Sequence, residues 1–260
     1  MYSFINGIWK DRFILQNLVK QDLYTRYRRS ALGIFWAILT PLGLVLIIGS
    51  VYSIIFGTDP KTFIPLLFAG LNPWLFISTS SDGGNMAFIG SEGYLKQTNV
   101  NAQIFPLRIV LGAFINLLYS LMAFFVVYLF LKPSLFSIKM LMIIPGLFII
   151  FIFSLALANF SAVINVNFRD YQPLQSLIFQ GLFYVTPIIY KTDMLKERGF
   201  EFVYKLNPFY YVIEVIRKPM LGEALPSINT YLISFSIAIV LFYISVKMVN
   251  KEKRILAFKL

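Results

Sequence analysis

Residues 21–54 read QDLYTRYRRSALGIFWAILTPLGLVLIIGSVYSI, and this stretch decides the fold. Its charged side chains are confined to the first part: Asp22, Arg26, Arg28 and Arg29. From residue 31 to residue 58 no side chain is charged. This apolar run exceeds the roughly 20 residues that a helix needs to cross a bilayer. We therefore expect a membrane surface at the junction, and the arginines indicate that it is the cytoplasmic surface.

The composition extends this interpretation to the whole chain. Of its 260 residues, 58% are hydrophobic and only 13% are charged, and the mean hydropathy is +0.74. A soluble domain has about twice this charged share. The sequence therefore predicts an all-α integral membrane protein formed by one domain, residues 1–260. The absence of cysteine and histidine removes disulfides and the commonest metal ligand, and it weighs against catalysis.

The net charge of +11 gathers in the two tails. Residues 1–33 hold six Lys or Arg against two Asp, and residues 247–260 hold five against one Glu. Basic flanks of this kind face the cytoplasm and its anionic lipid headgroups. Both termini are therefore expected in the cytoplasm, with membrane lipids rather than nucleic acid as partners.

The hydropathy pattern predicts six spans within residues 34–246. Their approximate ranges are 34–56, 63–89, 108–131, 140–164, 174–190 and 230–246. The second range contains GLNPW and STSSDGGN, so we expect an irregular helix that faces protein or a water-filled passage. The fourth carries Ser154, Ala158 and Ala162 at four-residue spacing, which favours close helix packing.

Two further segments are expected at the membrane surfaces. Residues 4–27 predict one amphipathic helix in the headgroup layer, with Asp11 on its polar side; it is either a simple anchor or a mechanical part. Residues 191–227 are nearly neutral and predict an external segment. Within it, Asn207-Pro208 indicates a helix start and Leu221-Gly222 a helix end. The apolar residues between them predict short re-entrant helices between spans five and six.

The spans offer little for chemistry. Apart from Asp82, they hold no charged residue in their interior, which disfavours an ion-coupled transporter. A membrane enzyme that transfers phosphate or sugar needs clustered carboxylates, and the twelve acidic residues are scattered through loops. The chain also lacks the nucleotide-binding pattern GxxxxGK[ST]. If ATP drives transport, another polypeptide hydrolyses it and contacts the inner loops near residues 92–99 and 169–170.

Several stretches resemble one family in order and spacing. They are RYRRSALGIFWAILTPL, GLNPWLFISTS with DGGN, EGYLKQTNVNAQIFPLRIV, the FRD loop before a span that ends in TPIIY, and LNPFYYVIEVIRKPML. Together they resemble the permease subunits of ABC-2 polysaccharide exporters, which serve O antigen (Wzm-type), capsule and teichoic acid. The resemblance covers nearly the whole chain.

This resemblance implies a homodimer of six-span subunits with two copies of a separate ATPase subunit, which binds ATP and Mg; this chain itself holds no cofactor or metal. It implies export of a lipid-linked polysaccharide across the bacterial plasma (inner) membrane. It makes residues 4–27 an interface or gate helix. It assigns ATPase coupling to Glu92, Tyr94, Leu95, Lys96, Arg169 and Asp170. It assigns the external gate to Asn207, Pro208, Tyr210, Tyr211 and Arg217.

The residues themselves suggest where the substrate binds. Sugar rings stack on aromatic side chains, and the candidates for such a lining are Trp36, Tyr52, Trp74, Phe76, Phe183, Tyr184 and Tyr190. The alternative is ordinary placement of aromatic residues at membrane interfaces. The arginines at 26, 28 and 29 could bind the pyrophosphate of a lipid carrier or form a cytoplasmic gate. Alternatively, they only set the orientation of the chain.

We therefore interpret the chain as an export permease, with O antigen as the foremost substrate. The alternatives are an ABC-2 permease for capsule, teichoic acid or a small lipid or drug, and a membrane enzyme that acts on lipid-linked sugars. Co-purification with an ATPase would favour transport, whereas activity of the isolated chain would favour the enzyme.

Overall fold

The computed structural model describes all residues except 1, 29, 223, 253–255 and 260. Its described part is helical and contains no strand. The long helices are α3 (Trp36–Ile55), α4 (Pro60–Asn85), α6 (Ile104–Leu131), α7 (Ile143–Asn167) and α12 (Ile228–Glu252). The shorter helices are α1 (Tyr2–Lys10), α2 (Arg12–Tyr27), α5 (Glu92–Gln97), α8 (Tyr171–Val185), α9 (Thr192–Glu197), α10 (Glu201–Lys205), α11 (Pro208–Leu221) and α13 (Leu256–Lys259).

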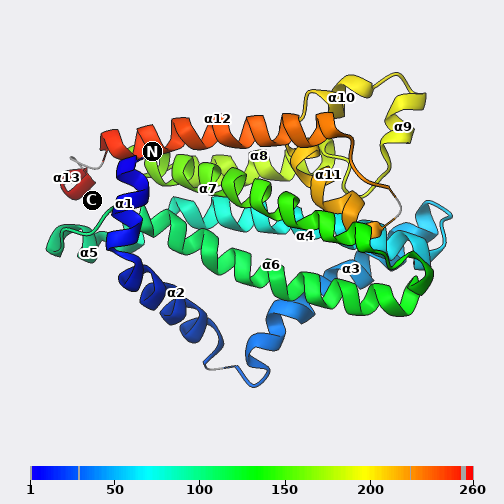
Figure 1. The fold of residues 1–260 in the computed structure, drawn as a ribbon, viewed down its shortest axis with the longest axis horizontal. Helices are drawn as coiled ribbons and strands as arrows, with labels where there is room; N and C mark the ends of the chain where they lie inside the picture. The colour runs from blue at the N-terminus through cyan, green and yellow to red at the C-terminus, as the bar shows by residue number, and fades with distance from the viewer. Residues whose placement is uncertain (1, 29, 223, 253–255, 260) are drawn as a thin grey trace.

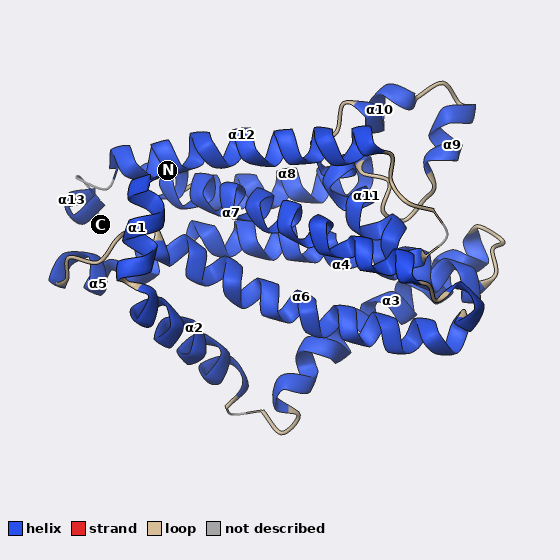
Figure 2. Cartoon of the chain, viewed as in Figure 1, coloured by secondary structure: helices blue, strands red, loops and turns tan. Residues whose placement is uncertain are grey.

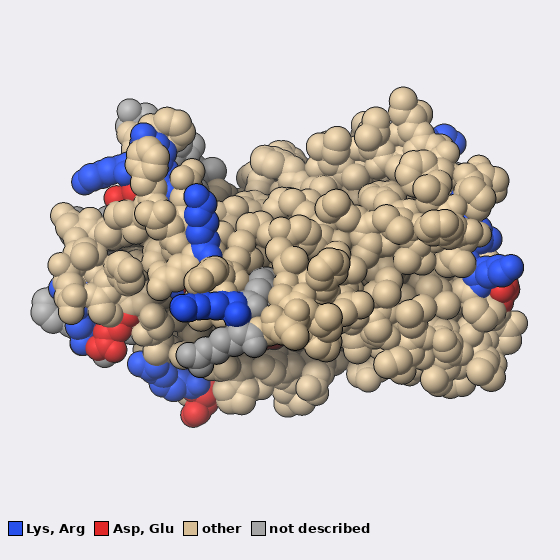
Figure 3. Space-filling view, turned by 90° about the horizontal axis from the view of Figure 1, so that it is seen from below, with Lys and Arg blue, Asp and Glu red and all other residues tan. Residues whose placement is uncertain are grey.

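The long helices run side by side along the long axis of the molecule (Figures 1 and 2). Both chain ends, with α1, α5 and α13, lie at one end of the bundle, here called the terminal end. Helices α9 and α10 lie at the opposite, distal end. The α4 helix is central and packs against α3, α6, α7 and α11. Charged side chains gather toward the two ends and leave a broad uncharged band between them (Figure 3), as expected for a bundle that crosses a bilayer.

Five of the six predicted spans have a matching helix. Among the described residues, the helices long and apolar enough to cross a membrane are Gly33–Ile55, Pro60–Asn85, Ile104–Leu131, Ile138–Asn167 and Ile228–Glu252. The second is more regular than the sequence suggested. Asp59 caps it by accepting from the backbone nitrogen of Lys61, Pro60 occupies its first turn, and the helix continues past Pro73.

The range predicted as the fifth span, 174–190, is not among these five helices. Its helix, α8, has 15 residues and ends at Val185. At about 1.5 Å per residue it is roughly 22 Å long, less than the hydrocarbon thickness of about 30 Å. Thr186 is extended and Pro187 follows it, so the helix stops before the predicted end.

The amphipathic segment is two helices rather than the predicted one. The chain breaks at Asp11, between α1 and α2. The Asp11 side chain is not on an exposed polar face: it is only 7% exposed, and its Oδ2 accepts from the backbone nitrogen of Asn101 at 2.8 Å. A Cβ atom at Gly7 would lie 1.8 Å from Asn101 Nδ2, so the two segments approach closely. The change of helix direction coincides with this long-range contact: α1 ends and α2 begins at the residue whose side chain binds the 98–103 loop.

Small residues hold the bundle core together. Ser154, Ala158 and Ala162 of α7 are fully buried, which confirms the predicted packing stripe. Opposite them, a Cβ at Gly84 of α4 would meet the backbone oxygen of Ala158 at 2.6 Å. A Cβ at Gly146 of α7 would likewise meet the backbone oxygen of Val215 in α11 at 2.5 Å. The backbones of α4, α7 and α11 are therefore in direct contact, as small residues permit in membrane bundles.

Candidate functional site

A cavity of about 1090 Å³ lies between α2, α3, α4 and α6. On α4 its lining extends from Asn72 to Gly83, which is roughly 16 Å of helix at about 1.5 Å per residue. Its walls alternate apolar side chains with polar ones: Gln21, Asp22, Arg26, Thr40, Asn72, Thr79, Arg108, Asn116 and Ser120. A cavity between otherwise apolar helices that carries this many polar groups suits a polar or amphiphilic ligand better than an acyl chain alone.

Four residues singled out in the sequence come together at this cavity: Arg26, Trp36, Phe76 and Tyr94. Trp36 is 49% exposed, and its indole nitrogen donates to Ser30 Oγ at 3.1 Å. Phe76 is almost fully buried. The cavity therefore has one exposed aromatic side chain on α3 and one buried aromatic side chain on α4.

The two described arginines of this segment, Arg26 and Arg28, lie in different surroundings. Arg26 lines the cavity, whereas the Arg28 guanidinium lies over the Tyr24 ring, 5.4 Å from its centroid. Arg29 lies outside the described residues. Of the two described arginines, Arg26 is the residue placed to reach a ligand in the cavity.

The sequence reasoning missed the ion pair in the cavity wall. The Arg108 guanidinium donates through Nε and Nη2 to the two carboxylate oxygens of Asp22, both at 2.5 Å. This fork-to-fork contact joins α2 to α6. The available signal was that Asp22 is one of only two acidic residues in the basic N-terminal segment and lies one helical turn before Arg26.

The other aromatic candidates do not line this cavity and lie in different parts of the chain. Trp74 is 5% exposed and packs against Phe183 at 5.7 Å, in a cluster with Phe179 and Phe209. Tyr184 is exposed on α8, and the Tyr190 hydroxyl donates to its backbone oxygen at 3.0 Å. Tyr52 lies near the distal end of α3, with its ring centroid 5.7 Å from that of Phe56. The candidates therefore do not form one continuous lining in a single chain.

At the distal end, α11 is the expected helix with the expected caps. The Asn207 side chain accepts from Phe209 N at 3.0 Å and donates to Thr186 Oγ1 at 2.8 Å, and Pro208 is the first helical residue. Gly222 ends the helix with φ of +68°, a conformation that favours glycine. Asn207 therefore both starts α11 and ties it to the segment after α8.

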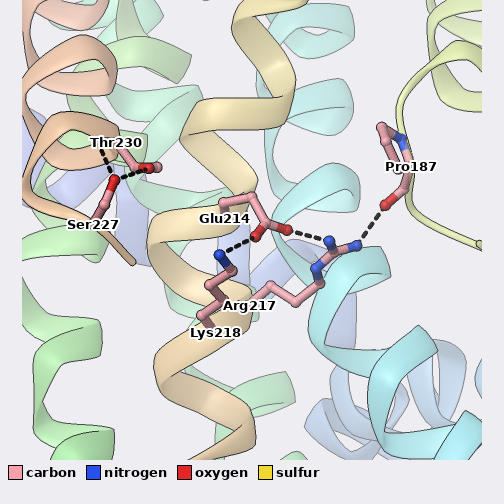
Figure 4. Close-up of polar contacts among 6 residues, drawn as sticks. All are labelled: Pro187, Glu214, Arg217, Lys218, Ser227 and Thr230. Carbon is pink, nitrogen blue, oxygen red and sulfur yellow. Dashed lines mark hydrogen bonds and ion pairs between the residues drawn. The ribbon is translucent and has the colours of Figure 1, made fainter. Parts of the chain in front are cut away.

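An ion pair of α11 is buried under this segment (Figure 4). Glu214 is 2% exposed and pairs with Arg217, which is 6% exposed; Lys218 approaches Glu214 from the surface at 3.4 Å. Arg217 Nη1 also donates to the backbone oxygen of Pro187 at 2.5 Å. The guanidinium thus joins α11 to the 186–190 segment, which lies within 3.4 Å of a Cβ built at Gly70 in the GLNPW motif.

The tyrosines predicted for the external gate lie next to a surface hairpin of short helices. The Tyr210 ring lies 5.0 Å from that of Tyr204, and the Tyr211 hydroxyl donates to the backbone oxygen of Lys205 at 2.9 Å. Lys205 also donates to Glu201 one turn earlier, and this hydrogen bond holds the pKa of Glu201 below its usual value. Both tyrosines thus attach the α9–α10 region to α11.

The predicted coupling residues lie at the terminal end. On α5, Lys96 pairs with Glu92 at 2.6 Å, Tyr94 is 43% exposed and Leu95 is partly buried against the core. Arg169 and Asp170 are exposed in the turn between α7 and α8.

The C-terminal helix α13 contacts α5. Lys259 donates to Asn167, next to the α7–α8 turn, at 2.5 Å and to Glu252 at 2.7 Å. The tail therefore bridges the two predicted coupling elements. Sequence reasoning missed this because no local pattern reports a contact of α13 with α5.

The acidic residue noted in the second span belongs to a polar network at the end of α4. Gln175 donates to Asp82 Oδ1 at 3.0 Å and accepts from Ser161 at 2.7 Å, and Ser161 lies 3.0 Å from Ser81. These contacts join α4, α7 and α8. In the described structure Asp82 is therefore engaged with its neighbours across three helices.

Comparison with known proteins agrees with this architecture. The sequence model of the ABC-2 type transporter family matches residues 14–221. The O-antigen export system permease protein RfbA of Myxococcus xanthus is 26% identical over 245 residues, which cover 94% of each chain. Two proteins of the same name from Klebsiella pneumoniae are 28% and 27% identical over 203 and 201 residues, 77% of each chain. Because the family match covers most of its length, including the cavity, α11 and the α7–α8 turn, this chain belongs to the ABC-2 type transporter family.

Proposed function

We propose that this chain is the permease subunit of an ABC transporter that exports a lipid-linked polysaccharide, an O antigen, from the cytoplasm to the outer face of the bacterial plasma membrane. The observation that carries the proposal is similarity over 94% of both chains to a protein named as an O-antigen export system permease. The terminal end of the bundle is then the cytoplasmic end, in agreement with its basic charge.

The cavity supports this function chemically. A glycan presents hydroxyl groups along its length and apolar C–H faces on its rings. The cavity wall offers both kinds of surface, with Trp36 and Phe76 beside polar groups such as Thr79 and Asn116. Arg26 lies in the same wall, where its guanidinium can bind the phosphate of a lipid carrier. The aromatic residues that lie outside the cavity would meet the glycan farther along its route.

The proposed assembly is a homodimer with two copies of a separate ATPase subunit, which binds ATP and Mg. The exposed apolar faces of α3 and α8 leave room for a second copy of this chain, with Ile47 and Ile54 on α3 and Leu177 on α8 among the exposed side chains. We assign the surface formed by α5, the α7–α8 turn and α13 to the ATPase. The exposed charges at Arg169 and Asp170 favour a polar partner there.

We further propose that the chain crosses the membrane six times, with α8 and the 186–190 segment forming the fifth crossing and α11 re-entering from outside. The direction of the neighbouring helices supports this topology. The α7 helix ends at the terminal end and α12 begins near the distal end, so α8 must lead back between them (Figure 1). Five crossings would place the two chain ends on opposite sides of the membrane.

The topology can be tested directly because the natural chain contains no cysteine. Single cysteines at Thr192 and Gln97 are to be labelled in intact spheroplasts with a membrane-impermeant maleimide. Six crossings predict that Thr192→Cys reacts and that Gln97→Cys reacts only after lysis. Equal protection of both cysteines would contradict the proposed fifth crossing.

Export is tested by deleting the gene in its own host. Loss of surface polymer, accumulation of polymer on its lipid carrier inside the cell, and rescue by the wild-type chain are expected. Normal surface polymer in the deletion strain would overturn the proposed substrate. Purification from membranes should also yield a stoichiometric nucleotide-binding subunit, and substrate turnover by the isolated chain would instead indicate an enzyme.

A further inference from the structure

The ion pair between Asp22 and Arg108 occupies the part of the cavity where α2 meets α6. It is only partly buried: the Arg108 side chain is 21% exposed and that of Asp22 is 34% exposed. Arg26 lies one turn after Asp22 on α2 and lines the same cavity. Within the described part of the chain, no ion pair or hydrogen bond holds Arg26. Two guanidinium groups and one carboxylate therefore line this cavity, with one positive charge in excess.

Arg108 binds the Asp22 carboxylate with the same geometry that it would use for the phosphate of a ligand. Guanidinium presents two parallel N–H groups, and this fork fits a carboxylate and a phosphate equally well. Asp22 thus occupies the position on Arg108 that a phosphate oxygen pair would occupy. Because Asp22 is on α2, a phosphate that replaced it would also remove the ionic contact between α2 and α6.

The rest of the cavity fits a molecule attached to such a phosphate. Farther along α4, Asn72 is 2% exposed and its Oδ1 accepts from Ser120 at 2.6 Å, while its Nδ2 has no hydrogen-bond partner. A buried amide donor without a hydrogen-bond partner destabilises the fold. A ligand hydroxyl or ring oxygen in the cavity would remove that cost if the Asn72 side chain turned toward it.

We infer that Arg108, together with Arg26, binds the phosphate of a lipid-linked substrate, and that Asp22 is an internal competitor whose displacement removes the ionic contact between α2 and α6, while Leu15, Leu18 and Val19 keep α2 packed on the core. This inference depends on the proposed function for the identity of the substrate. It adds two residues that the motif reasoning did not select. It also couples substrate binding to α2, since binding the phosphate and losing the ionic contact with α6 are the same exchange of partners on Arg108.

The test measures binding of undecaprenyl pyrophosphate to the full-length chain in nanodiscs, together with any ATPase subunit that co-purifies. Trp36 lines the cavity, so its fluorescence reports binding once the other two tryptophans are replaced by phenylalanine (W9F and W74F). Inorganic pyrophosphate and phosphatidylglycerol are the comparison probes. The inference predicts binding of undecaprenyl pyrophosphate, with weaker competition from either comparison probe. Equal competition by phosphatidylglycerol would show a general anionic lipid site and overturn the assignment.

The variants separate a binding role from a structural one. Asp22→Asn removes the competitor, so affinity should rise about threefold, as expected for a partly exposed ion pair. Arg108→Lys keeps the charge without the fork and should weaken binding several-fold. Arg108→Gln should weaken it by roughly tenfold or more, because charge-assisted hydrogen bonds are lost. Lys20→Gln removes a charge from α2 outside the cavity lining and should leave affinity unchanged.

The double variant D22N/R108Q decides between the two roles. If Arg108 serves only to hold α2, its loss should have no effect once Asp22 is already neutral. If Arg108 binds phosphate, the double variant should lose the affinity that Asp22→Asn gains. The inference is overturned if Asp22→Asn weakens binding or if the double variant binds as tightly as Asp22→Asn. The deletion experiment tests whether the chain exports the polymer, and these affinities test whether Arg108 binds phosphate. The failure of one proposal can therefore be distinguished from the failure of the other.

Discussion

The contact between Gly84 of α4 and Ala158 of α7 gives the sharpest stability prediction. A Cβ at position 84 would lie 2.6 Å from the Ala158 oxygen and 2.7 Å from its Cα. Carbon atoms pack best at about 3.5–4.0 Å, so Gly84→Ala forces the two backbones apart by roughly 0.8 Å. Both opposing atoms belong to the backbone, and no side-chain rotation can relieve the clash. An overpacked core contact of this kind costs about 1–3 kcal/mol.

The matched control is Gly112→Ala on α6. No atom lies within 4 Å of a Cβ built at Gly112, so alanine fits there without a clash. Alanine is favoured over glycine inside a helix by about 0.5–1 kcal/mol, which predicts equal or greater stability. The free energy of unfolding is to be measured for both variants by SDS titration in mixed micelles, followed by circular dichroism. If Gly84→Ala is as stable as the parent, or both variants shift alike, the close α4–α7 contact is wrong.

Two further substitutions test buried carboxylates. Glu214→Gln leaves the buried Arg217 charge without its ionic partner and should cost about 3–5 kcal/mol. Lys218→Met, at a side chain that is 41% exposed, should change the free energy of unfolding by less than about 1 kcal/mol, and a similar loss in both variants would contradict the buried pair. Asp11→Ala removes the acceptor for the Asn101 amide and should cost about 1–3 kcal/mol. Hydrogen exchange at residues 98–103 should become faster in Asp11→Ala. It should remain nearly unchanged in Asp11→Asn, because asparagine keeps a side-chain oxygen. Unchanged exchange in Asp11→Ala would refute the contact.

The features predicted correctly from sequence depend on local chemistry. The bounds of α11 follow from Asn207-Pro208 and Gly222, because helix caps act within one turn of the helix end. Five spans follow from hydropathy, since the cost of a charge in the bilayer applies to each residue separately. The packing stripe on α7 follows from its four-residue spacing. Each of these signals is complete within a short window of sequence.

The features that were missed depend on partners far along the chain. Asp11 is paired with a backbone amide 90 residues away, and Asp22 with a guanidinium 86 residues away. Both looked like ordinary polar positions on an amphipathic helix. Aromatic lining residues were equally hard to select, because 17% of the chain is aromatic and the composition favours no position over another. Periodicity shows which face of a helix is polar, but it does not show what that face contacts.

The distribution of these contacts divides the bundle into a rigid part and a movable part. Helices α4, α7 and α11 touch through backbone atoms at Gly84 and Gly146, and the buried Arg217 of α11 donates to the backbone oxygen of Pro187. Such close-packed contacts have one good arrangement. In contrast, α2 packs on the core through Leu15, Leu18 and Val19, its ion pair with α6 is partly exposed, and α3 is mostly exposed on its outer face. The cavity wall formed by α2 and α3 should therefore shift more easily than the wall formed by α4 and α6, and this shift should follow the occupancy of Arg108.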